Sequence, residues 1–216
     1  MTMKKVISLL ADSILAGVMI GIAATVSLSC DNRYIGSLLF GFGLFCIIFF
    51  KFGLYTGKVG YIPSNKPVFL IELLFTLLGN AAGTFFSAML IRCTRIAPPI
   101  IEKAAEMMNT KAFDTPLSML ILSFFCGILM FAAVHGFRLC KSENNSTASV
   151  VVVFWAIMVF IISGFNHCIA DMFYFFLSGM RNAGAAALYF PVIIIGNSLG
   201  GVFIPLIKKL SENKVD

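Results

Sequence analysis

The chain has 216 residues, of which 59% are hydrophobic and only 12% charged, and its mean hydropathy is +0.96. A soluble domain of this size needs far more polar surface, so the composition excludes an ordinary soluble protein. The net charge of +6 would suggest nucleic acid as a partner of a soluble chain. Here Lys and Arg lie instead at the ends of apolar blocks, where they set membrane orientation and meet anionic lipid, so we expect a lipid bilayer and no nucleic acid.

The six cysteines are scattered without a CxxC pair, and we expect no disulfide framework, metal site or cofactor.

Long apolar blocks predict six membrane-spanning helices. Each block can supply the roughly 20 helical residues that cross a hydrocarbon core. Lipid tolerates only helices or closed barrels, and these blocks are continuous rather than alternating, which favours helices. The first block has no convincing cleavage site and is kept as a span. The predicted spans are residues 6–29, 34–56, 67–92, 117–138, 149–179 and 184–207. The sequence therefore predicts one all-α transmembrane domain over residues 1–216.

The second and fifth spans contain polar residues at membrane depth. The second ends in Gly53-Leu54-Tyr55-Thr56-Gly57, and the fifth contains Gly164-Phe165-Asn166-His167-Cys168-Ile169-Ala170-Asp171. Such residues are costly inside a bilayer unless the backbone around them lines a cavity. We therefore predict that both helices are broken.

The pattern Gly-Asn-x-x-Gly occurs in the span that follows each break, at residues 79–83 and 196–200. Three spans in each half is an odd number, so the two halves face opposite ways. We predict an inverted repeat, with repeat one at about residues 1–95 and repeat two at about residues 112–210. The site is expected near mid-membrane where the broken helices meet, with Asn80 and Asn197 among its substrate-binding candidates.

The distribution of Lys and Arg predicts that both termini are cytoplasmic, in the plasma or inner membrane. With that orientation nine basic residues lie on the cytoplasmic side and six on the other. The nine are Lys4, Lys5, Lys58, Lys66, Arg138, Lys141, Lys208, Lys209 and Lys214, and the six are Arg33, Arg92, Arg95, Lys103, Lys111 and Arg181.

His167 is the first candidate for chemistry. A histidine in a broken apolar helix either holds helices together by hydrogen bonds or switches charge near neutral pH. The flanking Gly164, Asn166 and Asp171 and the matching break in the first half favour the functional interpretation. Thr56 is the counterpart in that half, where its hydroxyl either binds a small acid or caps a frayed helix end.

Lys51 lies in the apolar sequence Phe49-Phe50-Lys51-Phe52. It either attracts anions toward a pore or pairs with Asp12, Glu72 or Asp171, or reaches an interface. Both interpretations stay open.

Apolar residues near the two breaks are candidates for a constriction. A narrow ring of Phe and Leu passes a neutral molecule more easily than an ion. The alternative for each is a place in the core or against lipid. The candidates are Phe40, Leu44, Leu54 and Phe160.

Five motifs, in order along the chain, resemble those of the formate/nitrite transporter family. Residues 13–21, SILAGVMIG, resemble its first-helix motif LAGxxIG, and Leu54-Tyr55-Thr56-Gly57 is similar to its Leu-Phe-Thr loop. Residues 165–172, FNHCIADM, resemble its F-E-H-x-x-A-N-M signature. The two Gly-Asn-x-x-Gly stretches and Gly127-Ile128-Leu129 match as well, so the resemblance covers essentially the whole chain.

The resemblance implies a homopentamer of aquaporin-like six-helix protomers, each with its own pore. It implies that His167 is the central histidine, that Thr56 faces it across the pore, and that Lys111 is the family's lysine before the fourth helix. The four apolar residues named above would then line the constrictions.

The chain departs from the family pattern near the histidine. The family's Glu before the histidine is Asn166 here, and its Asn four residues after the histidine is Asp171. Its Cys-Asn-Trp in the fourth helix is Met130-Phe131-Ala132, and Lys51 stands where a small or polar residue is usual.

The predicted function is passive or proton-coupled passage of small monovalent anions or their conjugate acids, such as formate, nitrite, acetate, lactate and hydrosulfide. Lys51 and Lys111 would raise the anion concentration at the vestibules. Protonation, by His167 or by bulk water, would then yield a neutral acid able to cross the apolar rings. The alternative is a non-conducting or sensor-like pentamer whose pore Lys51 blocks by pairing with Asp171. The sequence contains no nucleophile–base pair or metal-ligand cluster, so we do not expect an enzyme.

Overall fold

The computed structural model describes residues 2–212, which form helices and loops without a strand. Polar caps begin several helices: Asn32 Oδ1 accepts the backbone N–H of Tyr34 at 2.9 Å, and Thr115 Oγ1 accepts that of Ser118 at 3.3 Å. Such caps satisfy N–H groups that the first helical turn leaves unpaired. The helices are α1 (Met3–Ser29), α2 (Arg33–Phe49), α3 (Tyr55–Lys58), α4 (Val68–Arg92), α5 (Ala97–Ala112), α6 (Pro116–Ser142), α7 (Ser146–Ile162), α8 (Cys168–Leu177) and α9 (Ala183–Glu212), with a 3₁₀ helix η1 at Val59–Ser64.

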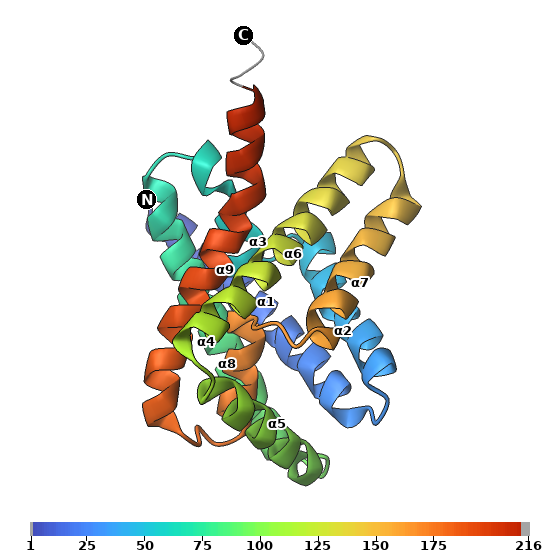
Figure 1. The fold of residues 1–216 in the computed structure, drawn as a ribbon, viewed down its shortest axis with the longest axis vertical. Helices are drawn as coiled ribbons and strands as arrows, with labels where there is room; N and C mark the ends of the chain where they lie inside the picture. The colour runs from blue at the N-terminus through green and yellow to red at the C-terminus, as the bar shows by residue number, and fades with distance from the viewer. Residues whose placement is uncertain (1, 213–216) are drawn as a thin grey trace.

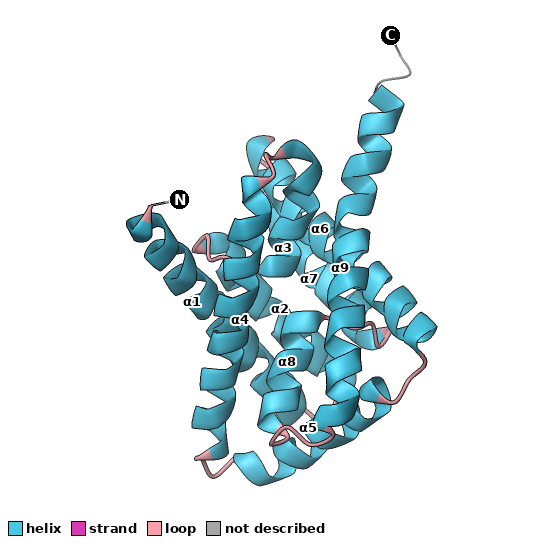
Figure 2. Ribbon diagram, turned by 90° about the vertical axis from the view of Figure 1, so that its left-hand side faces the viewer, coloured by secondary structure: helices cyan, strands magenta, loops and turns pink. Residues whose placement is uncertain are grey.

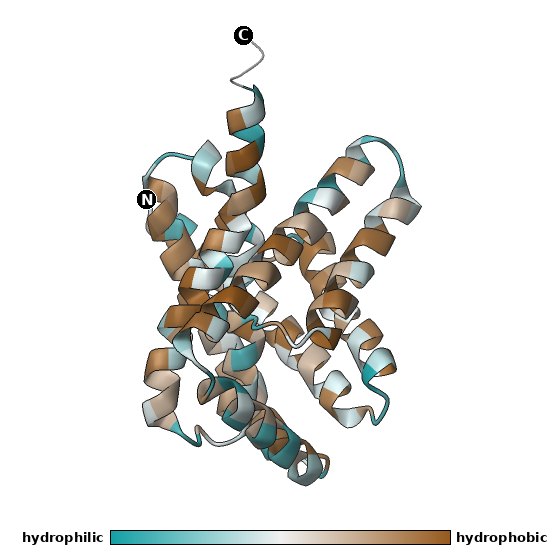
Figure 3. Cartoon of the chain, in the orientation of Figure 1, coloured by the Kyte–Doolittle hydropathy of each residue, from teal (hydrophilic) through white to brown (hydrophobic). Residues whose placement is uncertain are grey.

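Four helices, α1, α4, α6 and α9, are long and apolar enough to cross a membrane, and α2, α7 and α8 are shorter apolar helices. Hydrophobic residues run along these helices, whereas hydrophilic residues gather in α5 and at the chain turns (Figure 3). A helix that is apolar around most of its circumference must face lipid or the protein core. The chain is a multi-pass membrane protein.

Glycines allow the long helices to pack closely in two pairs. α1 packs against α4, and α6 packs against α9. A Cβ atom on Gly17 would lie 2.9 Å from Cα of Gly83, and one on Gly127 would lie 2.8 Å from the backbone N of Gly201. A side chain cannot occupy such a gap, so the two helices of each pair come closest to each other at these glycines. α2 and α7 contact each other beside these pairs (Figure 1).

Both predicted broken spans are interrupted, the second near its end and the fifth near its middle. In the second span, α2 ends at Phe49 and helix resumes at Tyr55. In the fifth span, α7 ends at Ile162 and helix resumes at Cys168. The short helices that follow the breaks, α3 and α8, lie in the middle of the bundle (Figure 2). The interruptions thus carry the two polar segments into the centre of the molecule.

The sequence analysis does not predict α5, an amphipathic helix at the end of the molecule away from the C-terminus (Figures 1 and 2). The guanidinium of Arg181 donates to both carboxylate oxygens of Glu102, at 3.0 and 3.1 Å, and so joins α5 to the loop before α9. This hydrogen bonding, together with the charge of Arg181, lowers the pKa of Glu102. Of the residues counted for orientation, Lys214 lies outside the described residues.

Candidate functional site

The centre of the candidate site is a hydrogen bond between the two broken segments. Thr56 Oγ1 lies 2.9 Å from His167 Nε2, and both residues are buried, at 0% and 2% exposure. Thr56 belongs to α3, and His167 is the residue that caps the start of α8. The structure therefore brings together the two residues that the sequence selects from opposite halves of the chain.

The contacts of His167 indicate which ring nitrogen carries the proton. Its Nδ1 accepts the backbone N–H of Ala170 at 3.1 Å, so this nitrogen presents a lone pair. In a neutral imidazole the proton then lies on Nε2. His167 consequently donates to the Thr56 hydroxyl, whose own proton stays free for a substrate. An imidazolium would need to give up the bond from Ala170.

Asn80 fastens the first break to the surrounding helices. Its Oδ1 accepts the N–H of Tyr55 at 2.8 Å, and its Nδ2 donates to the carbonyls of Ser13 and Gly53 at 2.8 and 2.7 Å. Unwound backbone in an apolar interior needs such partners, because no water is present to supply them.

Asn197 makes the equivalent set of bonds at the second break. Its Oδ1 accepts the N–H of Cys168 at 2.9 Å, and its Nδ2 donates to the carbonyls of Ser123 and Asn166 at 2.8 and 2.9 Å. Both N–H groups of each amide are therefore used by the backbone, which leaves no amide donor for a substrate. We assign Asn80 and Asn197 to holding the breaks rather than to substrate binding.

The four candidate constriction residues are all buried. Phe40 and Phe160 meet edge to face with their ring centroids 5.8 Å apart, and the Phe160 ring lies 5.7 Å from that of His167. Leu44 and Leu54 are 1% and 3% exposed. Apolar side chains thus adjoin the Thr56–His167 bond, and their role as a barrier stays a prediction.

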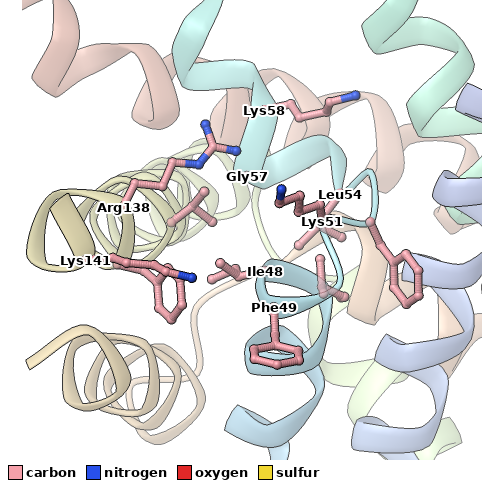
Figure 4. A pocket seen from close by; sticks show the side chains of 12 residues that line it. Ile48, Phe49, Lys51, Leu54, Gly57, Lys58, Arg138 and Lys141 are labelled. Carbon is pink, nitrogen blue, oxygen red and sulfur yellow. The ribbon is translucent and has the colours of Figure 1, made fainter. Parts of the chain in front are cut away.

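A cavity of about 440 Å³ adjoins the end of α2, the start of α3 and the last turns of α6. Leu54 and Gly57 line it, and so do four basic residues, Lys51, Lys58, Arg138 and Lys141 (Figure 4). Lys58 also borders a neighbouring hollow with Thr2, Lys5 and Glu72, which places the cavity on the side of the N-terminus. We call it the termini-side cavity.

A second cavity, of about 550 Å³, is bordered by α5, and we call it the α5-side cavity. Phe160 lines it, together with Lys111 and Asp171. The predicted constriction residues Leu54 and Phe160 thus line different cavities. Leu54 lies two residues before Thr56 in the chain, and the Phe160 ring lies against that of His167.

Lys111 and Asp171 form a buried ion pair at the α5-side cavity. Lys111 Nζ lies 2.6 Å from Asp171 Oδ1, and the Tyr189 hydroxyl donates to Asp171 Oδ2 at 2.7 Å. The Asp171 side chain is 0% exposed and that of Lys111 is 15% exposed. The backbone N–H of Asp171 donates to the carbonyl of His167 at 2.9 Å. Since every carboxylate oxygen has a donor, the pair fixes the first turn of α8.

Lys51 does not make the ion pairs that the sequence analysis considered. Asp171 pairs with Lys111, Glu72 pairs with Lys5 at 2.5 Å, and within residues 2–212 no ion pair involves Lys51 or Asp12. Lys51 is exposed at the termini-side cavity. The interpretation of Lys51 as the partner of Asp12, Glu72 or Asp171 is therefore wrong.

Asn166 is 1% exposed, and its backbone carbonyl is held by Asn197. Its Oδ1 is the one buried side-chain polar atom within residues 2–212 that lacks a hydrogen-bond partner. A buried acceptor without a donor is costly, so this amide has binding capacity that the rest of the protein does not use.

Sequence reasoning missed two features of the site. Lys58, Arg138 and Lys141 were considered only for membrane orientation, because nothing in the sequence brings such distant residues into one cavity. Tyr189 carried no signal, since a tyrosine among apolar residues of a membrane helix is ordinary at interfaces.

The sequence model of the family described as formate/nitrite transporter matches residues 2–208. The chain belongs to the formate/nitrite transporter family. Its relatives include a formate-nitrite transporter of Plasmodium knowlesi (strain H), 26% identical over 92% of this chain and 74% of that protein. Another is the nitrite transporter NirC of Escherichia coli (strain K12), 26% identical over 90% of this chain and 80% of that protein. The family consists of transporters and channels rather than enzymes, and the predicted resemblance is confirmed.

Solved structures of the family share the fold. A chain described as an FNT family ion channel matches with a TM-score of 0.82 and 21% identity, over 95% of this chain and 90% of that one. A pentameric formate channel with formate bound matches with a TM-score of 0.76 and 23% identity, over 98% and 99% of the two chains.

Proposed function

We propose that this formate/nitrite transporter family member moves small monovalent anions across the membrane as their neutral conjugate acids. The observation that carries the proposal is the buried Thr56–His167 hydrogen bond, which lies beside apolar residues that line two separate cavities. Formate, nitrite, acetate, lactate and hydrosulfide are the candidate cargoes, and the relatives named above support formate and nitrite.

The apolar barrier sets the protonation state of the cargo. A bare anion between Phe40 and Phe160 would lose its hydration, which costs far more than a few hydrogen bonds return. The termini-side cations attract the anion. The anion takes up a proton from the bulk solution on that side, which leaves the hydroxide in solution, as it passes from the cations to the apolar residues. The Thr56 hydroxyl, which accepts the His167 Nε2–H, then offers its own proton to the cargo among these apolar residues without adding a fixed charge.

We further propose that residues 1–95 and 112–210 are inverted repeats within one transmembrane domain, whose second and fifth spans are the broken ones. The matched hydrogen-bond sets of Asn80 and Asn197 and the matched packing of α1 on α4 and α6 on α9 support this symmetry. The pentameric formate channel among the structural neighbours supports a homopentamer. Both termini are proposed to face the cytoplasm, in the plasma or inner membrane.

The function is tested in liposomes that contain the purified protein and a pH-sensitive dye. Formate, nitrite, acetate, lactate and hydrosulfide are added in turn, and the rate of internal pH change is compared with that of protein-free vesicles. We expect a faster change for at least one of them and a slower one in His167→Phe. Unchanged pH-dependent flux in His167→Phe would remove the histidine from the mechanism.

The alternative is a non-conducting pentamer with Lys51 as the plug. It predicts that the wild-type protein produces no pH change above protein-free vesicles for any of the five cargoes, and that Lys51→Ala does. That alternative was based on a pair between Lys51 and Asp171, and in the structure Asp171 pairs with Lys111 instead.

A further inference from the structure

The termini-side cavity carries more positive charge than a monovalent cargo requires. Among the residues that the structure describes, those that line it include Lys51, Lys58, Arg138 and Lys141, and no Asp or Glu. In Figure 4 the nitrogens of Lys51, Arg138 and Lys141 point toward the space between them, whereas Lys58 points away. Three uncompensated cations therefore face one hollow.

Helix electrostatics explains where each of these cations lies but not their convergence. Arg138 and Lys141 belong to the last turns of α6, and Lys51 follows the end of α2, where positive charge is favourable. Lys51, however, has a φ of 61°, a left-handed conformation in which glycine is the usual residue after a helix. The Arg138 guanidinium lies 5.0 Å from the ring centre of Tyr61, which orients it.

Charge and shape together specify the ligand. A single monovalent anion leaves two of the three cations uncompensated, whereas a dianion with several oxygens can meet an arginine fork and two lysines at once. A cavity of about 440 Å³ has ample room for a phosphate group. One proton neutralises a monovalent anion but not a dianion, so a dianion cannot cross the apolar residues beyond Leu54.

We propose that the termini-side cavity binds a phosphate monoester dianion through Lys51, Arg138 and Lys141, and that the bound dianion closes the pore. The binding stands on the cavity alone, while the closure rests on the proposed transport function. The same chemistry is present in a soluble phosphate ester and in the headgroup of phosphatidic acid.

Binding is measured with the purified full chain in detergent, from the rise in thermal midpoint as glycerol phosphate is added at constant ionic strength. We expect a saturable rise that sodium formate does not produce. Because the second pKa of a phosphate monoester is about 6, the rise should be larger at pH 7.5 than at pH 5.5. Lys141→Gln should weaken binding about tenfold, the equivalent of one charge-assisted hydrogen bond.

A matched pair of triple variants separates the cavity from net charge. Lys51→Gln/Arg138→Gln/Lys141→Gln should lose the rise. Lys66→Gln/Lys208→Gln/Lys209→Gln, which removes the same charge outside the cavity, should keep it. The proposal is overturned if both triples lose the rise equally. It is also overturned if wild type shows a rise neither with glycerol phosphate nor in phosphatidic acid nanodiscs.

Two further experiments ask whether the bound phosphate belongs to a soluble ester or to a lipid, and whether its binding closes the pore. A rise in nanodiscs that contain phosphatidic acid, without any response to glycerol phosphate, assigns the site to the lipid headgroup. In liposomes of phosphatidylcholine, glycerol phosphate should inhibit formate-driven pH change in wild type, and in Lys141→Gln only at about tenfold higher concentration. Binding with undiminished flux overturns the closure, and absence of wild-type flux leaves the binding arm to decide the site.

Discussion

Replacing Gly200 by alanine tests whether α6 and α9 contact each other directly through their backbones. An added Cβ atom would collide with the carbonyl oxygen of Phe124, and would lie 2.8 Å from its carbonyl carbon and 3.0 Å from the N of Ile128. All three are backbone atoms, so no change of rotamer relieves the overlap. The two helices must move apart.

The cost of that movement follows from the contacts at the crossing. Carbon atoms attract best at about 3.5–4.0 Å, so the helices must separate by about 1 Å, and overpacking of this kind costs about 1–3 kcal/mol. Asn197, less than one turn before Gly200, donates to the Ser123 carbonyl across the same crossing at 2.8 Å. Stretching this bond by about 1 Å leaves a buried polar group unpaired, at about 1–3 kcal/mol. We expect Gly200→Ala to lose about 2–6 kcal/mol of stability.

The assay is thermal unfolding of the purified variants in one detergent. Gly184→Ala is the matched control, because it lies in the same helix and its Cβ would meet nothing within 4 Å. Alanine is the better helix former by about 1 kcal/mol, so this control should match or exceed wild type. Equal midpoints for Gly200→Ala and Gly184→Ala would refute the direct backbone contact.

Thr56→Val leaves the His167 Nε2–H without an acceptor and should slow anion flux in liposomes about tenfold, the equivalent of one buried hydrogen bond, while Thr56→Ser should stay near wild type. Met180 has a φ of 57°, and Met180→Gly should raise the thermal midpoint, because a side chain in that conformation costs about 1–2 kcal/mol. The depressed pKa of Glu102 means that its pairing with Arg181 is complete above the unfolded value of about 4.3 and is lost as pH falls through the lower folded value. Amide exchange of α5, corrected for its intrinsic pH dependence, should therefore accelerate on acidification in wild type but be fast throughout in Glu102→Gln.

The interrupted spans were predictable because their cause is local. Residues 53–57 and 164–171 combine glycine with polar side chains inside apolar runs, and the cost of unpaired backbone in lipid confines such segments to cavities. The same logic selected Thr56 and His167, which the structure joins at 2.9 Å. Composition and order along the chain were sufficient for these features.

The missed features depend on tertiary contacts. α5 was not predicted because its polar face lowers its hydropathy below that of a membrane span. Its amphipathic periodicity, rather than its hydropathy, was the signal that could have revealed it. Lys111 received its role only from a resemblance, since residues 60 positions apart meet in its pair with Asp171. The backbone roles of Asn80 and Asn197 were equally hidden, because an amide in a motif that occurs twice does not reveal which groups it faces.

The two cavities differ in electrostatic character, and this difference bears on how anions reach the barrier. Within residues 2–212, three cations and three carboxylates line the α5-side cavity, whereas four cations and no carboxylate line the termini-side cavity. An uncompensated cluster of cations raises the local anion concentration, and salt screens it over about 10 Å at 0.1 M. Anion entry from the side of the termini should therefore slow with added salt, while entry from the α5 side should change little. The net flux at equilibrium is zero whichever side the anion enters from. The difference between the cavities therefore affects the rate of anion entry and not the driving force. The termini-side cations therefore speed the entry of anions from that side of the membrane. The same cations are the groups that we propose bind the dianion that closes the pore.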